Sequence, residues 1–184
     1  MKVLQKMAMM LTIVAASAVT VAAQEKGDMA AGVNFAVGMG DELTNFGFGA
    51  KFQYNVIAPL RLEGVFTYFL PKTEGVEGIA ESKTSMWDLS VNAHYLFPLG
   101  EKVAVYPLAG VGILGVTSSV EMDLGEFGGG DADMSASSSD FGVNLGGGID
   151  FKLTEVLILN AEAKYKIGGD FNRFIISAGV AYKF

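Results

Sequence analysis

The chain of 184 residues is long enough for one domain with a short appendage, is 51% hydrophobic and carries a net charge of −7. It has no cysteine, which excludes a disulfide framework, a zinc site with cysteine ligands and a lipid anchor on cysteine. The acidic balance argues against general nucleic-acid binding. Beyond the first two dozen residues, no apolar run approaches the ~18 residues of a membrane helix.

Residues 1–23 have the three parts of a secretory signal peptide. Two lysines precede an uncharged apolar core, and Val21 and Ala23 fit the small-residue rule for cleavage. A retained membrane anchor is the alternative. We therefore predict a signal peptide over 1–23 and an exported mature domain over 24–184.

The mature chain alternates apolar residues with polar or small residues along eight segments. A period of two is typical of β-strands that have one apolar face. The predicted strands are 31–40, 45–56, 60–70, 86–97, 102–116, 141–152, 157–167 and 173–184. Most are near the ~9–11 residues that cross a bilayer at a tilt.

The segment 102–116 is the least clear strand, because both of its faces carry apolar residues and Pro107 removes a ladder donor. We expect Gly110 and Gly112 to face inward. The residues expected to face outward are Val103, Val105, Ala109, Val111 and Ile113.

The connections between the predicted strands alternate in length. Those after the second, fourth and sixth strands are tight, whereas those after the third and fifth are the polar loops 71–84 and 117–139. This alternation is typical of the short periplasmic turns and longer external loops of outer-membrane barrels. It places both termini in the periplasm and both long loops outside the cell.

The loop 117–139 carries five acidic residues and no basic residue. Carboxylates and carbonyls are suitable calcium ligands, so a calcium site is one interpretation. A solvated anionic loop is the interpretation we favour, because glycine and serine do not hold ligands rigidly. If the protein has an external ligand or surface partner, we expect it to bind at 117–139.

Aromatic residues fall at two levels of this up-and-down path, as in the girdles of a lipid-embedded barrel. One level holds Phe46, Phe48, Tyr68, Trp87, Phe141, Tyr165 and Phe174, and the other holds Phe52, Tyr54, Tyr95, Phe97, Phe151, Tyr182 and Phe184. A soluble barrel would instead have an apolar interior and a charged exterior. The signal peptide, the girdles and the aromatic C-terminus favour an all-β, eight-stranded antiparallel transmembrane β-barrel.

Polar residues on the opposite faces of these strands would then line the barrel interior, where charges must pair. The predicted interior polar network is Lys51, Arg61, Glu63, Asp88, His94, Asp150, Glu162 and Lys164. His94 is the only histidine, and Ser90 on the same strand is roughly 13 Å away. We therefore expect His94 to form interior hydrogen bonds, and we predict no catalytic, cofactor-binding or metal-binding residue.

The last predicted strand ends in GVAYKF, with Val180, Tyr182 and Phe184 on its apolar face. This ending, the strands FGFGAKFQY and FGVNLGGGIDF and the segment YPLAGVG resemble the small eight-stranded outer-membrane barrels of Gram-negative bacteria, the OmpA-like and OmpX-like porin-family proteins. The resemblance implies an integral outer-membrane protein among outer-membrane lipids. It also implies that the barrel-assembly machinery reads the C-terminal strand. We expect no peptidoglycan-binding domain of the OmpA kind.

These features predict a non-enzymatic outer-membrane protein with a structural or surface-interaction role for its external loops. A narrow passive diffusion pore is the alternative. A lipid-modifying enzyme is disfavoured, because His94 has no nucleophile beside it on its own strand. No cofactor is expected.

Overall fold

The computed structural model describes residues 26–40, 44–76, 80–122, 132–168 and 172–184. Its strands are β1 Met29–Gly40, β2 Thr44–Ile57, β3 Leu60–Val76, β4 Ala80–Tyr95, β5 Phe97–Pro98, β6 Val103–Met122, β7 Ala132–Lys152, β8 Leu157–Ile167 and β9 Arg173–Lys183. The predicted signal peptide lies outside the described residues. Within them, no helix is long and apolar enough to cross a membrane.

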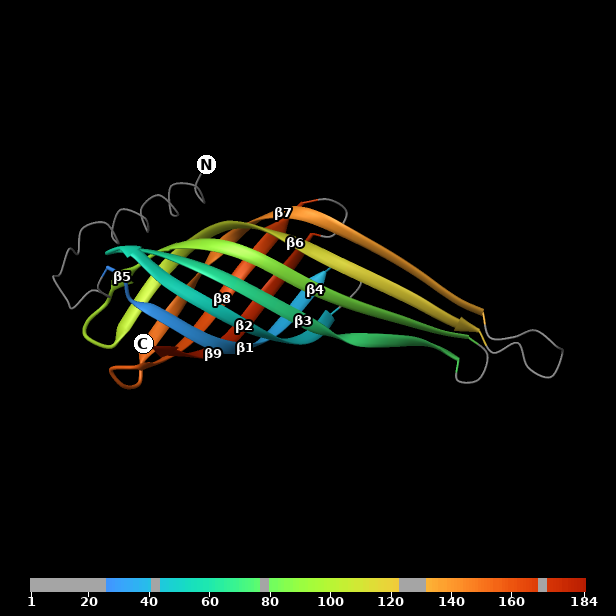
Figure 1. Ribbon diagram of the computed structural model, residues 1–184, viewed down its shortest axis with the longest axis horizontal. Helices are drawn as coiled ribbons and strands as arrows, with labels where there is room; N and C mark the ends of the chain where they lie inside the picture. Colours follow the sequence, from blue (N-terminus) through green and yellow to red (C-terminus); the bar gives the residue numbers. More distant parts are fainter. Residues whose placement is uncertain (1–25, 41–43, 77–79, 123–131, 169–171) are drawn as a thin grey trace, which may run out of the picture.

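The strands form one closed antiparallel sheet. Each long strand pairs with its neighbours in sequence, β1 pairs with β9, and the β4–β6 pairing completes the ring. The two-residue β5 continues the line of β4 past Leu96 and, like β4, pairs with β6. Because β4 and β5 together occupy one position in the ring, the barrel is eight-stranded (Figure 1). The predicted eight-stranded up-and-down barrel is confirmed.

The outer surface of this barrel is apolar and its interior is polar. Val33, Phe48 and Val91 are more than half exposed, whereas Arg61 and Glu63 are at most 1% exposed. A soluble barrel has the reverse arrangement, since water covers its outside. An apolar outer surface around a polar interior is typical of a barrel surrounded by lipid.

Strand β6 has the facing expected for 102–116. Val111 and Ile113 are exposed on the outer surface, while Tyr106, Leu108 and Leu114 are buried inside. The alternation of the neighbouring strands therefore continues through Pro107, although apolar side chains occupy both faces.

Aromatic side chains contact or face one another at two levels of the outer surface. At one level Tyr68 lies opposite both Phe48 and Trp87. At the other level the rings of Tyr95 and Phe97 lie 4.9 Å apart. These contacts fit the two aromatic girdles that a membrane-embedded barrel places at its interfaces.

The prediction of loops at 71–84 and 117–139 is wrong, because most residues of both segments lie in β-strands. Strand β3 continues to Val76, which pairs with Ala80 of β4, and β6 continues to Met122, which pairs with Ala132 of β7. The alternation signal fails here because consecutive residues are exposed, as at Ser137, Ser138 and Ser139, so neither face requires apolar residues.

The four prolonged strands form one sheet that projects past the barrel, which we call the hairpin extension (residues 71–76, 80–85, 117–122 and 132–139; Figure 1). Its central pairing runs between β4 and β6 as far as Glu81 and Glu121. The end of the barrel that carries it is called the hairpin end below. Phe184 lies at the opposite end, where its backbone N–H donates to Met29 O at 3.0 Å.

Glycines let strands approach closely on the inside of the barrel. A Cβ at Gly32 would clash with the carbonyl of Val180 and lie 2.8 Å from Ala181 Cα. We expect Gly32→Ala to lower the free energy of unfolding by about 1–3 kcal/mol, because the backbone of β9 must shift. The matched control is Gly64→Ala, since nothing lies within 4 Å of a Cβ there. Urea titrations in lipid vesicles measure both, and equal stability of the two variants would contradict the packing argument.

Candidate functional site in the barrel interior

Large polar side chains from six of the eight barrel strands fill the middle of the barrel. They pack against small residues of the remaining two strands, β1 and β9. Lys51, Arg61 and Glu63 point inward from β2 and β3 because each alternates with an exposed apolar neighbour. Strands β1 and β9 face them with small residues such as Gly32 and Gly179. The interior is therefore closed by side chains, as expected for eight strands.

Lys51 lies at the centre of the larger group of polar side chains. Its Nζ is 2.8 Å from Glu162 Oε1 and 3.2 Å from Glu63 Oε2, and it donates to Asn160 Oδ1 at 3.0 Å. Gln53 donates to the same Glu63 Oε2 at 2.9 Å. One ammonium group thus joins carboxylates from opposite walls of the barrel.

Arg61 forms the second ion pair of this group. Its Nη1 donates to Asp150 Oδ2 at 2.6 Å, and its guanidinium carbon lies 4.8 Å from the ring centre of Tyr106. Tyr106 also stacks on His94, with ring centres 4.5 Å apart, and its hydroxyl donates to Glu162 Oε1 at 2.9 Å. The central cluster is defined as Lys51, Arg61, Glu63, His94, Tyr106, Asp150, Asn160 and Glu162.

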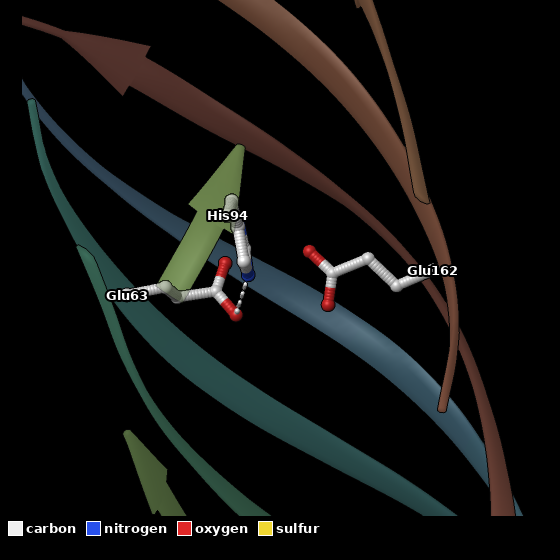
Figure 2. Close-up of side chains that lie close together, drawn as sticks. All are labelled: Glu63, His94 and Glu162. Carbon is white, nitrogen blue, oxygen red and sulfur yellow. Dashed lines mark ion pairs between the residues drawn. The ribbon is translucent and has the colours of Figure 1, made fainter. Parts of the chain in front are cut away.

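His94 has a defined hydrogen-bonding role within the central cluster. Arg61 Nε and Nη2 lie 3.2 and 3.0 Å from His94 Nδ1. An arginine can only donate, so Nδ1 accepts and the proton of the neutral ring lies on Nε2. Nε2 in turn faces Glu63 Oε1 at 3.8 Å, and Figure 2 shows the Glu162 carboxylate turned toward the same space.

A second group of charges lies nearer the hairpin end, centred on Asp88. Lys166 pairs with Asp88 Oδ2, Lys164 Nζ lies 3.7 Å from Oδ1, and Ser90 donates to Oδ1 at 2.6 Å. Beyond it, the buried Arg173 lies over the ring of Phe69. An apolar cluster of Ala36, Phe69, Met86, Val116 and Ile175 occupies the same end of the interior.

All eight residues of the predicted interior network lie inside the barrel, each at most 6% exposed. The structure brings them together in two groups rather than one. Asp88 and Lys164 belong to the group near the hairpin end, and the other six belong to the central cluster.

The predicted network left out interior residues of both groups, among them Tyr106 and Lys166. Tyr106 follows from the facing of 102–116, because it alternates with the outward Val105, but the ambiguity of that segment hid it. Lys166 shares the inward face of 157–167 with Glu162 and Lys164, so the alternation alone could have found it.

The interior charges are sealed from solvent. Arg61, Glu63 and His94 are at most 1% exposed, and Lys51 and Glu162 at most 5%. A continuous column of water would leave such side chains accessible. Two hollows of about 40 and about 10 Å³ lie beside the central cluster, at the end opposite the hairpin extension. Neither has the volume of a drug-sized ligand site.

A family profile described as outer membrane protein beta-barrel domain matches residues 8–184. The chain belongs to this family. It is an integral β-barrel protein of the bacterial outer membrane. A comparison with curated proteins gave no significant match.

Solved structures of small outer-membrane barrels share the fold of this family member. Ail of Yersinia pestis, in complex with the heparin analogue sucrose octasulfate, has a TM-score of 0.59 at 21% identity, covering 86% of this chain and 99% of Ail. Neisserial surface protein A has a TM-score of 0.53 at 21% identity, covering 85% and 96%. A major outer membrane protein of Thermus thermophilus has a TM-score of 0.59 at 16% identity, covering 85% and 99%. These likenesses concern the barrel fold.

Proposed function

We propose that this protein is a non-enzymatic surface-interaction protein, which presents the hairpin extension outside the cell on a closed barrel. The single observation that carries the proposal is the unpaired β7 edge of that extension. Residues Ala132–Asp140 of β7 pair with β6 on one side, and no described strand pairs with them on the other. A polar sheet edge in water is a template for an added strand.

The side chains at this edge suit a peptide partner. Ser137, Ser138 and Ser139 are exposed and small, so an incoming strand meets little steric resistance. The segment 117–139 is acidic without a basic residue, which favours a cationic partner. Ail was solved with a heparin analogue, a polyanion, and the charge of this segment argues against that ligand class here. A calcium site at 117–139 stays an alternative.

A binding comparison tests the partner class. We expect the barrel in nanodiscs to bind polylysine, and a variant with 118–136 replaced by Asn-Gly to lose most of that binding, since it lacks the free edge. Heparin is the matched polyanion control. Binding of heparin, or equal polylysine binding by both proteins, would refute the cationic-partner proposal.

The proposed orientation places both termini in the periplasm. The ends of β1 and β9 are hydrogen-bonded neighbours at the end opposite the hairpin extension, and long extensions belong outside in this fold class. The proposal includes recognition of Val180, Tyr182 and Phe184 by the barrel-assembly machinery. Tyr182 and Phe184 are 55% and 65% exposed, so their rings are accessible on the outer surface.

Cysteine labelling tests the orientation, because the protein has no native cysteine. Ser138→Cys places a thiol on the hairpin extension, and Glu155→Cys places one in the exposed β7–β8 turn at the other end. With a membrane-impermeant maleimide on intact cells, we expect Ser138→Cys to react and Glu155→Cys to react only after lysis. The reverse pattern would invert the orientation.

The two alternative functions, a narrow diffusion pore and a lipid-modifying enzyme, receive less support. A narrow pore needs interior side chains that are open to water, and those of the central cluster are buried. An enzyme of the histidine type needs a nucleophile at the imidazole. The polar and aromatic side chains around His94 include Arg61, Tyr106, Glu63 and Glu162, and none of them is a serine, threonine or cysteine.

A further inference from the structure

The space between Glu63, His94 and Glu162 has polar atoms aimed into it from three walls of the barrel (Figure 2). One ligand-type atom of each residue lies within 4.8 Å of the other two, and all three residues are buried. Glu63 Oε1 and His94 Nε2 have no hydrogen-bond partner in the protein, although both residues are 0% exposed. Leaving such buried groups unpaired destabilises the folded protein.

Direct pairing of these two atoms does not satisfy them. Glu63 Oε1 and His94 Nε2 are 3.8 Å apart, beyond the range of a hydrogen bond. One oxygen of each carboxylate is already engaged, because Lys51 contacts Glu63 Oε2 and Glu162 Oε1. The contacts of Lys51 therefore hold both carboxylates in place.

The dimensions of the triangle match a single bridging atom. A point inside three atoms that are at most 4.8 Å apart lies within about 2.8 Å of each of them. That distance is typical of a hydrogen bond to oxygen. A water oxygen at this point has three polar partners, the usual number for a buried water.

The hydrogen-bond polarity at the triangle also suits water. Because Arg61 donates to Nδ1, the neutral ring of His94 carries its proton on Nε2 and can donate from there. Glu63 and Glu162 are acceptors. Water accepts one hydrogen bond and donates two, which matches one N–H donor and two carboxylate acceptors, and it supplies the partners that Glu63 Oε1 and His94 Nε2 lack.

The same polarity opposes a metal ion. A metal-bound imidazole needs a lone pair on the ligating nitrogen and normally donates a hydrogen bond from the other ring nitrogen. In this structure the other nitrogen of His94 accepts from Arg61. Lys51 already supplies a positive charge to both carboxylates.

We infer that Glu63, His94 and Glu162 form a binding site for one water molecule, which joins β3 and β4 to β8 across the barrel interior. The site completes the hydrogen bonding of the central cluster. It selects water over a divalent cation because Arg61 fixes the tautomer of His94.

The single histidine makes a direct test possible. The untagged mature protein is refolded in nanodiscs with ¹⁵N-labelled histidine, and its ring nitrogens are observed by NMR with and without millimolar Zn²⁺. We expect the Nε2–H tautomer, a cross-peak between that proton and water, and no change of the ring shifts with Zn²⁺. An Nδ1–H tautomer or Zn²⁺-dependent shifts would overturn the site. An Nε2–H proton without a water contact would overturn it too.

Two variants separate the water site from a general loss of folding. Glu162→Met removes both carboxylate oxygens, keeps a side chain of similar length and leaves Arg61 in place, so the tautomer should stay and the water contact should weaken. Tyr106→Phe removes only the hydroxyl on Glu162 Oε1, and both signals should persist. If Glu162→Met leaves the water contact at full intensity, Glu162 is not part of the site.

Discussion

Replacing Arg61 with methionine is expected to destabilise the folded barrel by about 3–5 kcal/mol. The variant leaves the buried Asp150 carboxylate without its 2.6 Å ion pair and removes both donors to His94 Nδ1. Neither group can reach bulk water, since Asp150 is 2% exposed and His94 is 0% exposed. Urea unfolding in lipid vesicles, followed by the gel shift between unheated and boiled samples, measures the loss.

The matched control is Lys183→Met, which removes an ion pair at the rim. Lys183 Nζ lies 2.8 Å from Asp28 Oδ2, but its side chain is 34% exposed, so water replaces the lost contact. A loss of at most about 1 kcal/mol is expected. Equal losses for Arg61→Met and Lys183→Met would mean that burial does not strengthen the interior pair.

Replacing Val91 with lysine is expected to cost about 2–4 kcal/mol of barrel stability in a bilayer. Val91 is 55% exposed on the outer surface of β4, and its neighbours in register are Gly64 and Val111. If this surface faces hydrocarbon, an ammonium group there loses its hydration. The same urea titration measures the effect.

Ser138→Lys is the control for the lipid-facing substitution. Ser138 is also exposed, but it lies on the hairpin extension beyond the apolar band. Its replacement should change stability by less than about 0.5 kcal/mol. A destabilised Ser138→Lys together with an unaffected Val91→Lys would contradict the assignment of the membrane-facing surface.

The facing of the barrel strands was predictable from sequence because lipid and a polar interior impose opposite demands on alternate residues. Val91 and Asn92 are neighbours in the chain, yet one is 55% exposed and the other 1%. That contrast recurs on the other strands, so a period of two was enough to find the fold and most of the inward residues.

The hairpin extension was not predictable by the same rule. Beyond the apolar band both faces of the strands meet water, as at Ser137 and Ser138, which are both exposed. The ladder from Thr117 and Ser137 outward rests on backbone hydrogen bonds, which leave no side-chain period in the sequence. Serine and glycine then favour a loop interpretation.

The division of the interior charges into two groups could not be predicted from the sequence either. Which carboxylate each cation reaches depends on the stagger between strands that are far apart in the chain. Lys51 meets Glu162 across 111 positions, and Arg61 meets Asp150 across 89. Alternation places these residues inside, but only the register of the closed sheet pairs them.

The closed interior is the central claim, and single-channel recording tests it most directly. Protein comprising residues 24–184 is refolded, checked by the heat-dependent gel shift and added to planar bilayers in which a channel-forming barrel serves as positive control. The account predicts a folded protein with no discrete conductance steps, because Lys51, Arg61 and their partners fill the interior. Reproducible conductance steps from the folded protein would contradict it and make the central cluster a selectivity filter.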